Sequence, residues 1–347
     1  MGSRAYPGEV DAGSPRRICA NKALAIPVSV LTGFLGSGKT TLLSHLLRQP
    51  ELSRAAVIIN EFGEIGLDHE LVEASEDSVI ALTTGCLCCK VRSDLTETLH
   101  DLLRRRDAGA LPQAFDHIVI ETSGLADPAP ILQTFATDRA LGGEFAVEVV
   151  IAVIDAVNGL ATVEWSAEAR KQVILADRLI VTKTDLAEAG AVERLMARIA
   201  ALNPRAVIAT AVDGELDPSC LTEAQAAIAP GDARSGFVAE AAHSDGIISF
   251  ALTEDAPIAW EPFARAMETL LALRGPDLLR IKGLLNVAGC RGPVLVQAVM
   301  HLAHPPVELE AWPDDERTSR IVFITRNVPE GAVRELFRAI RTLAPAE

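Results

Sequence analysis

The sequence predicts an α/β fold, in which a mostly parallel sheet is covered by helices, followed by a smaller α+β domain. Short apolar runs alternate with helix-like runs over the first part of the chain, which is typical of a parallel sheet buried on both faces. A Gly-rich loop follows the first apolar run, at the place where such sheets bind ligands. Toward the C-terminus the order of elements changes, and strands and helices follow an α+β pattern.

The chain of 347 residues is long enough for two ordinary domains. Residues 1–25 mix Gly, Pro, Ser and charged side chains, and they are expected to form a loose N-terminal tail. We expect the first domain over residues 26–232 and the second over residues 246–347. The stretch 233–245, in an Ala-, Gly- and Asp-rich region, is the expected linker between them.

The first domain is expected to alternate strands with helices. The apolar runs that predict its strands are Ile26–Leu31, Ala55–Ile59, Val79–Leu82, Asp116–Ile120, Val147–Ile154, Arg178–Val181 and Ala206–Ala209. The runs that predict its helices are Thr40–Leu47, Ser93–Arg106 and Val192–Leu202. Strands separated by helices favour a parallel sheet.

The second domain is expected to have a different order. Strands are predicted over Gly246–Leu252, Leu278–Val287, Pro293–His301 and Ser319–Thr325, and helices over Glu261–Leu273 and Glu330–Leu343. The second and third of these strands should pair antiparallel, because a Gly-containing turn joins them. This α+β order is compatible with a ferredoxin-like topology.

Charge and cysteine usage exclude several classes of partner. The formal net charge of −15 disfavours a nucleic-acid partner. No stretch reaches the roughly 18 apolar residues of a membrane span, so no membrane partner is expected. The N-terminus lacks the apolar block of a signal peptide. Three of the six cysteines lie within four positions, which suits a metal or redox site in a reducing compartment, so we expect a cytoplasmic protein.

The segment Gly33–Thr40 matches the phosphate-binding P-loop pattern in full, between an apolar strand and a helix. Its glycines let successive backbone N–H groups point at a phosphate. Lys39 should reach the β- and γ-phosphates, and the Thr40 hydroxyl should ligate Mg²⁺. The residues of this region expected to bind nucleotide are Gly33, Gly36, Ser37, Gly38, Lys39, Thr40 and Thr41.

A P-loop requires an acidic partner for Mg²⁺ at the end of a neighbouring strand. Glu121 ends the apolar strand that begins near His117, and Thr122-Ser123-Gly124 follows it. Glu121 is expected to hold a Mg²⁺-bound water or to orient the attacking water, and it is the predicted catalytic partner of Lys39. The backbone N–H of Gly124 is expected to sense the γ-phosphate.

Thr182-Lys183-Thr184-Asp185 follows another predicted strand and carries the chemistry of base choice. The Asp185 carboxylate can accept two hydrogen bonds from guanine, which adenine cannot donate. The Lys183 stem can lie across the purine face. The predicted nucleotide is therefore GTP, with GDP as the product.

The motif Cys86-Leu87-Cys88-Cys89 lies between the P-loop and Glu121. Its three thiols are soft ligands that suit Zn²⁺, with Co²⁺ and Cu⁺ as alternatives. The helix that follows should lower the thiol pKa values through its N-terminal dipole. A catalytic disulfide and three buried structural cysteines remain alternatives. Glu64, after the second strand, is the candidate fourth ligand, with a simply solvated carboxylate as its alternative.

Together these motifs resemble the CobW-like family of metal-chaperone GTPases, relatives of the nickel-insertion GTPases of urease and hydrogenase. The segments that carry the resemblance are Gly33–Thr40, Asn60–Glu64, Gly85–Cys89, Glu121–Pro128, Thr182–Asp185, Leu278–Gly283 and Gln297–Trp312. The likeness spans about Ile26 to Leu343. It implies GTP hydrolysis with Mg²⁺, a Zn²⁺-class ion at the cysteine motif and delivery to a client apoprotein.

The sequence departs from the family pattern at several positions. Thr182 stands where the general GTPase pattern has Asn, so we expect one loop-tying hydrogen bond to be missing and guanine selectivity to be relaxed. Ile59 occupies a position that some relatives fill with Glu. The chain has only seven histidines and no His-rich tract near the domain junction. His301 and His304 fit surface or packing residues better than ligands.

The resulting hypothesis is a GTP-hydrolysing metallochaperone whose metal affinity depends on the bound nucleotide. A homodimer that depends on nucleotide or metal is compatible with this hypothesis. Two rival functions are a P-loop kinase that phosphorylates a small molecule, and a metal sensor in which nucleotide only gates a protein contact. The kinase alternative leaves the cysteine motif unexplained.

Overall fold

The chain forms two compact units in the computed structural model, which is described for residues 25–52, 54–60, 80–83, 91–111, 115–217, 246–309, 311–312 and 317–343. The N-terminal unit comprises Ala25–Thr134 and Glu144–Ala227. The C-terminal unit gathers Phe135–Gly143 with the described residues from 246 onward. The sequence did not anticipate that Phe135–Gly143 groups with this second unit. The predicted tail and linker lie almost wholly outside the described residues.

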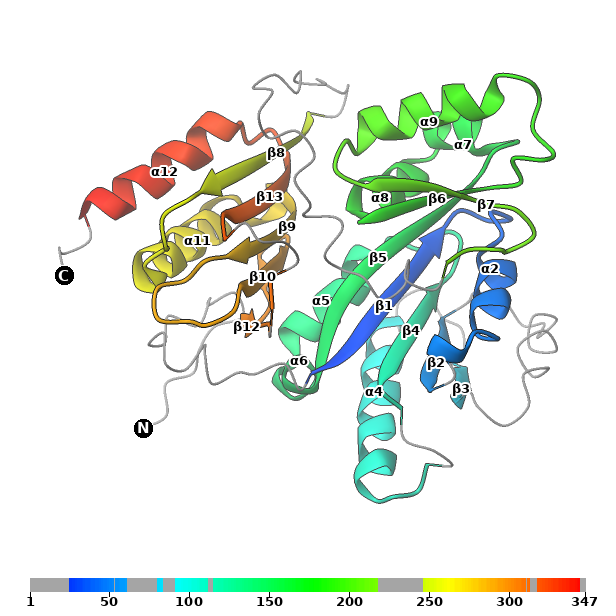
Figure 1. Cartoon of the computed structure of the whole chain (residues 1–347), viewed down its shortest axis with the longest axis horizontal. Helices are drawn as coiled ribbons and strands as arrows, with labels where there is room; N and C mark the ends of the chain where they lie inside the picture. Colours follow the sequence, from blue (N-terminus) through cyan, green and yellow to red (C-terminus); the bar gives the residue numbers. More distant parts are fainter. Residues whose placement is uncertain are drawn as a thin grey trace. The chain divides into compact units, whose positions relative to one another are not determined.

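The N-terminal unit is built on a seven-stranded sheet in the order β3-β2-β4-β1-β5-β6-β7 (Figure 1). Each strand pairs parallel with its neighbours. The strands are β1 (Ile26–Gly33), β2 (Ala55–Asn60), β3 (Ile80–Thr83), β4 (His117–Thr122), β5 (Phe145–Asp155), β6 (Arg178–Thr182) and β7 (Val207–Ala211). The predicted α/β class is confirmed, and all seven predicted strands are present.

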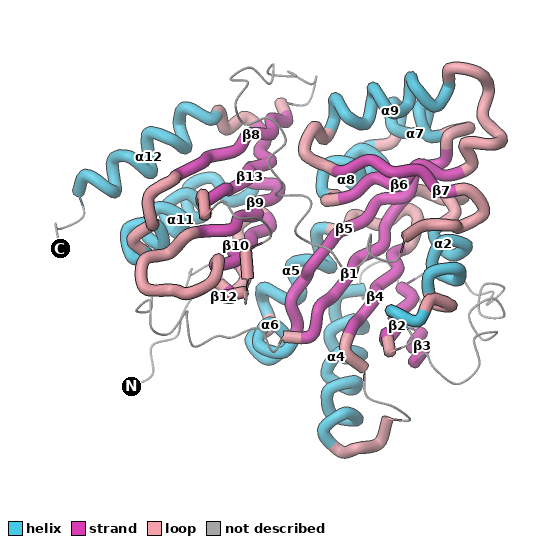
Figure 2. Tube along the Cα trace, in the orientation of Figure 1, coloured by secondary structure: helices cyan, strands magenta, loops and turns pink. Residues whose placement is uncertain are grey.

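Helices separate these strands along the chain (Figure 2). They are α2 (Lys39–Leu46), the 3₁₀ turn η1 (Pro50–Leu52), α4 (Val91–Asp107), α5 (Ala129–Thr137), α6 (Arg139–Glu144), α7 (Gly159–Trp165), α8 (Ala167–Leu175) and α9 (Ala191–Leu202). The sequence predicted α2, α4 and α9 and missed the four from α5 to α8. The missed helices are short, the longest having nine residues.

Both faces of the parallel sheet are buried. Leu42, Leu43 and Leu46 of α2 belong to one buried cluster with strand residues such as Val119. A second cluster unites α7, α8 and α9 with strand residues such as Val181. Because both faces need apolar side chains, the strands carry nearly continuous apolar runs. Those runs are what made the strands predictable.

The C-terminal unit contains an antiparallel sheet in the order β11-β10-β9-β13-β8, with β12 also paired to β10. Its elements are β8 (Ile247–Glu254), α11 (Trp260–Arg274), the 3₁₀ turn η3 (Gly275–Asp277), β9 (Leu278–Leu285), β10 (Val294–Val299), β11 (Leu302–Ala303), β12 (Val307–Glu308), β13 (Ser319–Arg326) and α12 (Glu330–Leu343). The predicted α+β class and the predicted antiparallel pair are confirmed.

The suggested ferredoxin-like topology is met only in its first half. β8, α11 and β9 form a split β-α-β unit, because β13 lies between the two strands and pairs antiparallel with both. In the ferredoxin-like motif the second helix precedes the last strand, whereas here α12 follows β13. The order of elements is therefore different after β10.

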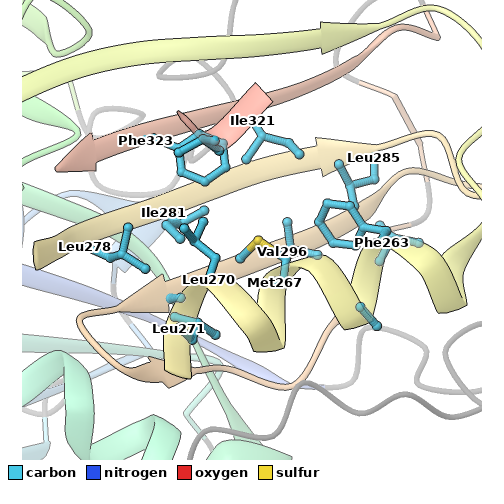
Figure 3. Close-up of a cluster of buried hydrophobic side chains, with 14 of the residues drawn as sticks. Phe263, Met267, Leu270, Leu271, Leu278, Ile281, Leu285, Val296, Ile321 and Phe323 are labelled. Atoms are coloured by element: carbon cyan, nitrogen blue, oxygen red, sulfur yellow. The ribbon is translucent and has the colours of Figure 1, made fainter. Parts of the chain in front are cut away.

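The core of the C-terminal unit forms between α11 and one face of its sheet (Figure 3). Phe263, Met267 and Leu270 of the helix meet Ile281 and Phe323 of the strands. On β10 the core residues Val294, Val296 and Ala298 occupy alternate positions, as the geometry of a strand requires.

Two further observations concern the expected environment of the protein. No helix in the described part of the chain is both long and apolar enough to cross a membrane. Cys290, between β9 and β10, is disulfide-bonded, which does not fit the reducing compartment that the sequence predicts. The cytoplasmic location stays a prediction.

Candidate nucleotide site

The phosphate loop requires glycine where the chain leaves β1. Gly33 has a φ of 146°, and a Cβ at this position would lie 2.3 Å from the carbonyl oxygen of Val153. Gly38, with a φ of 93°, adopts a left-handed conformation directly before α2. Side chains are disfavoured at both positions. The glycines of the motif therefore serve the loop backbone itself, which leads into the start of α2, where an anion can bind.

Lys39 and Thr40 lie at the first turn of α2. The Lys39 side chain is buried to 7% exposure, and its Nζ donates to the carbonyl oxygen of Phe34 at 3.3 Å. This contact keeps the ammonium group of Lys39 against the backbone of the phosphate loop. Buried cations need such partners, and a phosphate would be a stronger one.

Thr40 and Glu121 are brought together from positions 81 residues apart in the sequence. Thr40 Oγ1 donates a hydrogen bond to Glu121 Oε1 at 2.9 Å. Parallel pairing of β1 with β4 places Glu121 beside Leu31, just before the phosphate loop, and the Glu121 side chain is 1% exposed. A hydroxyl and a carboxylate are hard oxygen ligands of the kind that Mg²⁺ prefers. The two residues fit the predicted magnesium site.

Gly124 lies against the phosphate loop. A Cβ at Gly124 would lie 2.7 Å from the backbone nitrogen of Leu35, so only glycine permits this approach. The preceding peptide is fixed, because the Ser123 carbonyl accepts hydrogen bonds from Ala126 N at 3.0 Å and from Thr122 Oγ1 at 3.3 Å. The segment after Glu121 therefore lies beside the phosphate loop, and the contact of Gly124 with a γ-phosphate stays a prediction.

The segment Thr182–Asp185, for which base recognition is predicted, is joined to the phosphate loop by two hydrogen bonds. Thr182 Oγ1 donates to the Ser37 carbonyl at 2.7 Å, and Lys183 Nζ donates to the Gly36 carbonyl at 2.6 Å. The expectation that Thr182 leaves a loop-tying bond unmade is therefore wrong, because the shorter hydroxyl side chain still reaches the loop. Lys183 has a φ of 55°, and Asp185 is exposed two residues further on.

The predicted metal ligands Cys86, Cys88, Cys89 and Glu64 lie outside the described residues. Among the residues that are described, no three His, Cys, Asp or Glu side chains gather as a metal site. Ile59, at the position that some relatives fill with Glu, is 7% exposed and belongs to an apolar cluster.

The two histidines of the second domain behave as packing or surface residues. His301 is exposed. Burial lowers the pKa of His304 to about 4, and Arg280 acts in the same direction. An imidazole held neutral by burial fits the packing role that the sequence favoured.

Several residues near the site carry no motif and were missed by the sequence. Phe34 of the phosphate loop packs edge-on against Trp165 of α7, with ring centroids 5.4 Å apart. Gln172 of α8 contacts the segment after Glu121, and its neighbour Lys171 forms an ion pair with Asp127. No sequence pattern marks Trp165 or Gln172, because only the fold brings them to the site.

Comparison with known proteins identifies the relationship. The chain matches the model of the CobW/HypB/UreG nucleotide-binding domain over residues 27–210 and that of the cobalamin synthesis protein cobW C-terminal domain over residues 247–341. The zinc chaperone YjiA of Escherichia coli (strain K12) is 36% identical over 321 residues, which cover 91% of this chain and 99% of YjiA. The zinc chaperone CobW of Pseudomonas aeruginosa is 32% identical over 378 residues, which cover 97% of this chain and 96% of that relative.

A solved structure is similar over both units. The crystal structure of Zn(II)-bound YjiA GTPase from E. coli matches with a TM-score of 0.65 and 33% identity, covering 91% of this chain and 99% of that one. The expected resemblance is thereby confirmed. The chain belongs to the CobW/HypB/UreG family, with the nucleotide-binding domain followed by the cobW C-terminal domain.

Proposed function

We propose that this protein is a GTP-hydrolysing metallochaperone that binds a Zn²⁺-class ion at Cys86-Leu87-Cys88-Cys89 and delivers it to a client protein. The observation that carries the proposal is the contact of Thr40 with Glu121 beside a fully formed phosphate loop. The proposal is also supported by the similarity to YjiA, a protein described both as a GTPase and as a zinc chaperone.

The phosphate side of the site has a proposed role for each side chain. Lys39 neutralises the β- and γ-phosphates, Thr40 ligates Mg²⁺, and Glu121 holds a Mg²⁺-bound water or orients the attacking water. When bound, Mg²⁺ offsets the negative charge that develops on the phosphate oxygens. The Gly124 N–H donates to the γ-phosphate, which makes the following segment sensitive to hydrolysis. Gly33, Gly36, Ser37, Gly38 and Thr41 complete the binding loop.

The base side selects guanine through Asp185, whose carboxylate accepts from the N1–H and the exocyclic amine. Lys183 packs its stem on the purine. The tie from Thr182 to Ser37 supports a defined base pocket. We therefore propose stricter preference for GTP over ATP than the Thr at this position suggested.

The cargo is proposed to be Zn²⁺, with Co²⁺ as an alternative. Cys86, Cys88 and Cys89 supply three thiolates, and Glu64 is the proposed fourth ligand. The motif lies in sequence between the P-loop and Glu121. In this proposal the segments around both change conformation when the γ-phosphate is present. Nucleotide and metal affinities must then be reciprocally coupled. A client apoprotein, a nucleotide- or metal-dependent homodimer and a cytoplasmic location complete the proposal, with domains over 26–232 and 246–347.

A metal titration against a competing chelator tests the coupling. A non-hydrolysable GTP analogue is expected to change Zn²⁺ affinity by about 5–150-fold relative to GDP. The double variant Cys88→Ser/Cys89→Ser should lose the effect of metal on GTP hydrolysis while retaining nucleotide binding.

Two outcomes would overturn parts of the proposal. Superimposable zinc titrations in the apo, GDP and analogue states would remove nucleotide-dependent delivery. Coupling without measurable turnover would instead favour a nucleotide-gated metal sensor.

A further inference from the structure

Helix α8 holds the segment that follows Glu121. Gln172 is 1% exposed, and its Nε2 donates to the carbonyl oxygens of Gly124 at 3.3 Å and of Ala126 at 3.0 Å. The preceding residue, Lys171, has its Nζ 2.8 Å from Asp127 Oδ2. Two adjacent residues of α8 therefore hold three residues of that segment, which are Gly124, Ala126 and Asp127. A buried amide that uses both hydrogens on two loop carbonyls restricts the loop more than a surface ion pair does.

Hydrogen bonds fix the peptide units on both sides of Gly124. The preceding carbonyl, of Ser123, accepts from Ala126 N, and the following carbonyl, of Gly124 itself, accepts from Gln172. Because the peptide is planar and trans, the Gly124 N–H points opposite to the Ser123 carbonyl. In the described part of the chain this N–H makes no hydrogen bond. It is held in a defined direction beside the phosphate loop.

The same part of the fold also touches the phosphate loop. Phe34 packs edge-on against Trp165, at the end of the helix before α8. Phe34, Ser37 and Gln172 line one small cavity of about 10 Å³ beneath the loop. The Ser37 hydroxyl there is 1% exposed and has no hydrogen-bond partner among the described residues. Gln172 thus lies between the two segments that would contact the γ-phosphate.

We infer that Gln172 is a positioning residue that sets the Gly124 N–H for the γ-phosphate. The inference rests on the proposed GTP hydrolysis and adds a residue that no motif indicates. Gln172 acts in this proposal only through the two loop carbonyls to which it donates. Its contribution should therefore be specific to the γ-phosphate, because GDP has no group for the Gly124 N–H to meet.

The test replaces Gln172 by Met, which keeps the volume and loses both donors. The readouts are the affinities for a non-hydrolysable GTP analogue and for GDP. Loss of two hydrogen bonds should weaken analogue binding about 5–10-fold and change GDP binding less than about twofold. Steady-state kcat should fall about tenfold. Gln172→Asn keeps the amide but is one methylene shorter, and it should also weaken analogue binding more than GDP binding. This variant replaces Gln172→Met in the test if the Met variant folds poorly.

Asn203 supplies the matched control. Its Nδ2 is equally buried and donates to the carbonyls of Val173, Ile174 and Ala176, which follow Gln172 at the C-terminal end of α8. Asn203→Leu should lower the melting temperature as Gln172→Met does but leave the ratio of analogue to GDP affinity unchanged.

The outcomes separate this inference from the proposed function. An equal loss of both affinities in Gln172→Met, no loss of either, or a shifted ratio in Asn203→Leu would each overturn the positioning role. If the wild-type protein neither binds nor hydrolyses GTP, the proposed function fails first and the inference with it.

Discussion

The phosphate side and the base side of the candidate site are built differently. On the phosphate side the functional side chains are buried, with Lys39 at 7% exposure and Glu121 at 1%. On the base side Asp185 is exposed, and the next residue, Leu186, is 67% exposed. The phosphate side owes its geometry to the packed ends of β1 and β4. The base side depends on a short segment tied back to the phosphate loop by Thr182 and Lys183.

This difference determines how strongly each side should respond to substitution. Charges in a buried, water-poor setting interact more strongly than exposed charges, which solvent and salt screen. Removal of a buried group also leaves its partner unsatisfied. Substitutions on the phosphate side should therefore abolish chemistry, whereas those on the base side should change selectivity and affinity by smaller factors.

The largest effect is expected for Lys39→Ala. The β- and γ-phosphates lose their point charge in a site where it is not screened, so kcat for GTP should fall by at least about 100-fold. Nucleotide binding should weaken as well. Steady-state phosphate release and a binding titration measure the two effects. Arg194→Ala, which removes an exposed cation of α9, is the control for net charge. GTPase activity near the wild-type level would disprove the phosphate-loop assignment.

An intermediate effect is expected for Asp185→Asn. The paired acceptor for guanine is lost, and the preference for GTP over XTP and ATP should fall by about 10–100-fold. Competition binding with the three nucleotides decides this. Glu188→Gln, at an exposed carboxylate three residues further on, should leave the ranking unchanged. If the ranking survives in Asp185→Asn as well, another residue reads the base.

The sequence predicted those parts of the molecule whose pattern has one dominant physical cause. The strands were visible because burial on both faces demands apolar runs, as at Val147–Ile154. The phosphate loop could be recognised in the sequence because the backbone conformations at Gly33 and Gly38 favour glycine. α9 was visible because one face is buried through Leu195 and Ile199 and the other is charged.

The remaining elements lacked such a pattern. α8 buries Gln172, Val173, Ile174 and Leu175 in succession, so its sequence has no helical period to detect. The role of Gln172 depends on two loop carbonyls 46 and 48 residues away, a proximity that only the fold supplies. Thr182 was misjudged for the same reason, because a residue type does not give the distance from its hydroxyl to another loop.

The smallest effect on binding and turnover is expected for substitution of Thr182, whose hydrogen bond to Ser37 joins the base side to the phosphate side. Thr182→Val keeps the shape of the side chain and removes the hydrogen bond to the Ser37 carbonyl. The loss of one such bond should weaken GTP and GDP binding equally, by about fivefold or about 1 kcal/mol. The turnover number at saturating GTP should change less than about twofold, because Thr40 and Glu121 are held by the sheet and not by this segment.

Thr182→Ser is the control for that substitution, since it keeps the hydroxyl and should retain wild-type affinity. Binding titrations with both nucleotides and the turnover number at saturation measure the outcome. A fall in turnover comparable to that of Lys39→Ala would mean that the base segment also organises the phosphate side. Unchanged affinities would mean that the bond from Lys183 to Gly36 holds the segment alone. Equal losses of GTP and GDP affinity with an unchanged turnover number would show that Thr182 supports nucleotide binding and that the phosphate side carries out the chemistry without it.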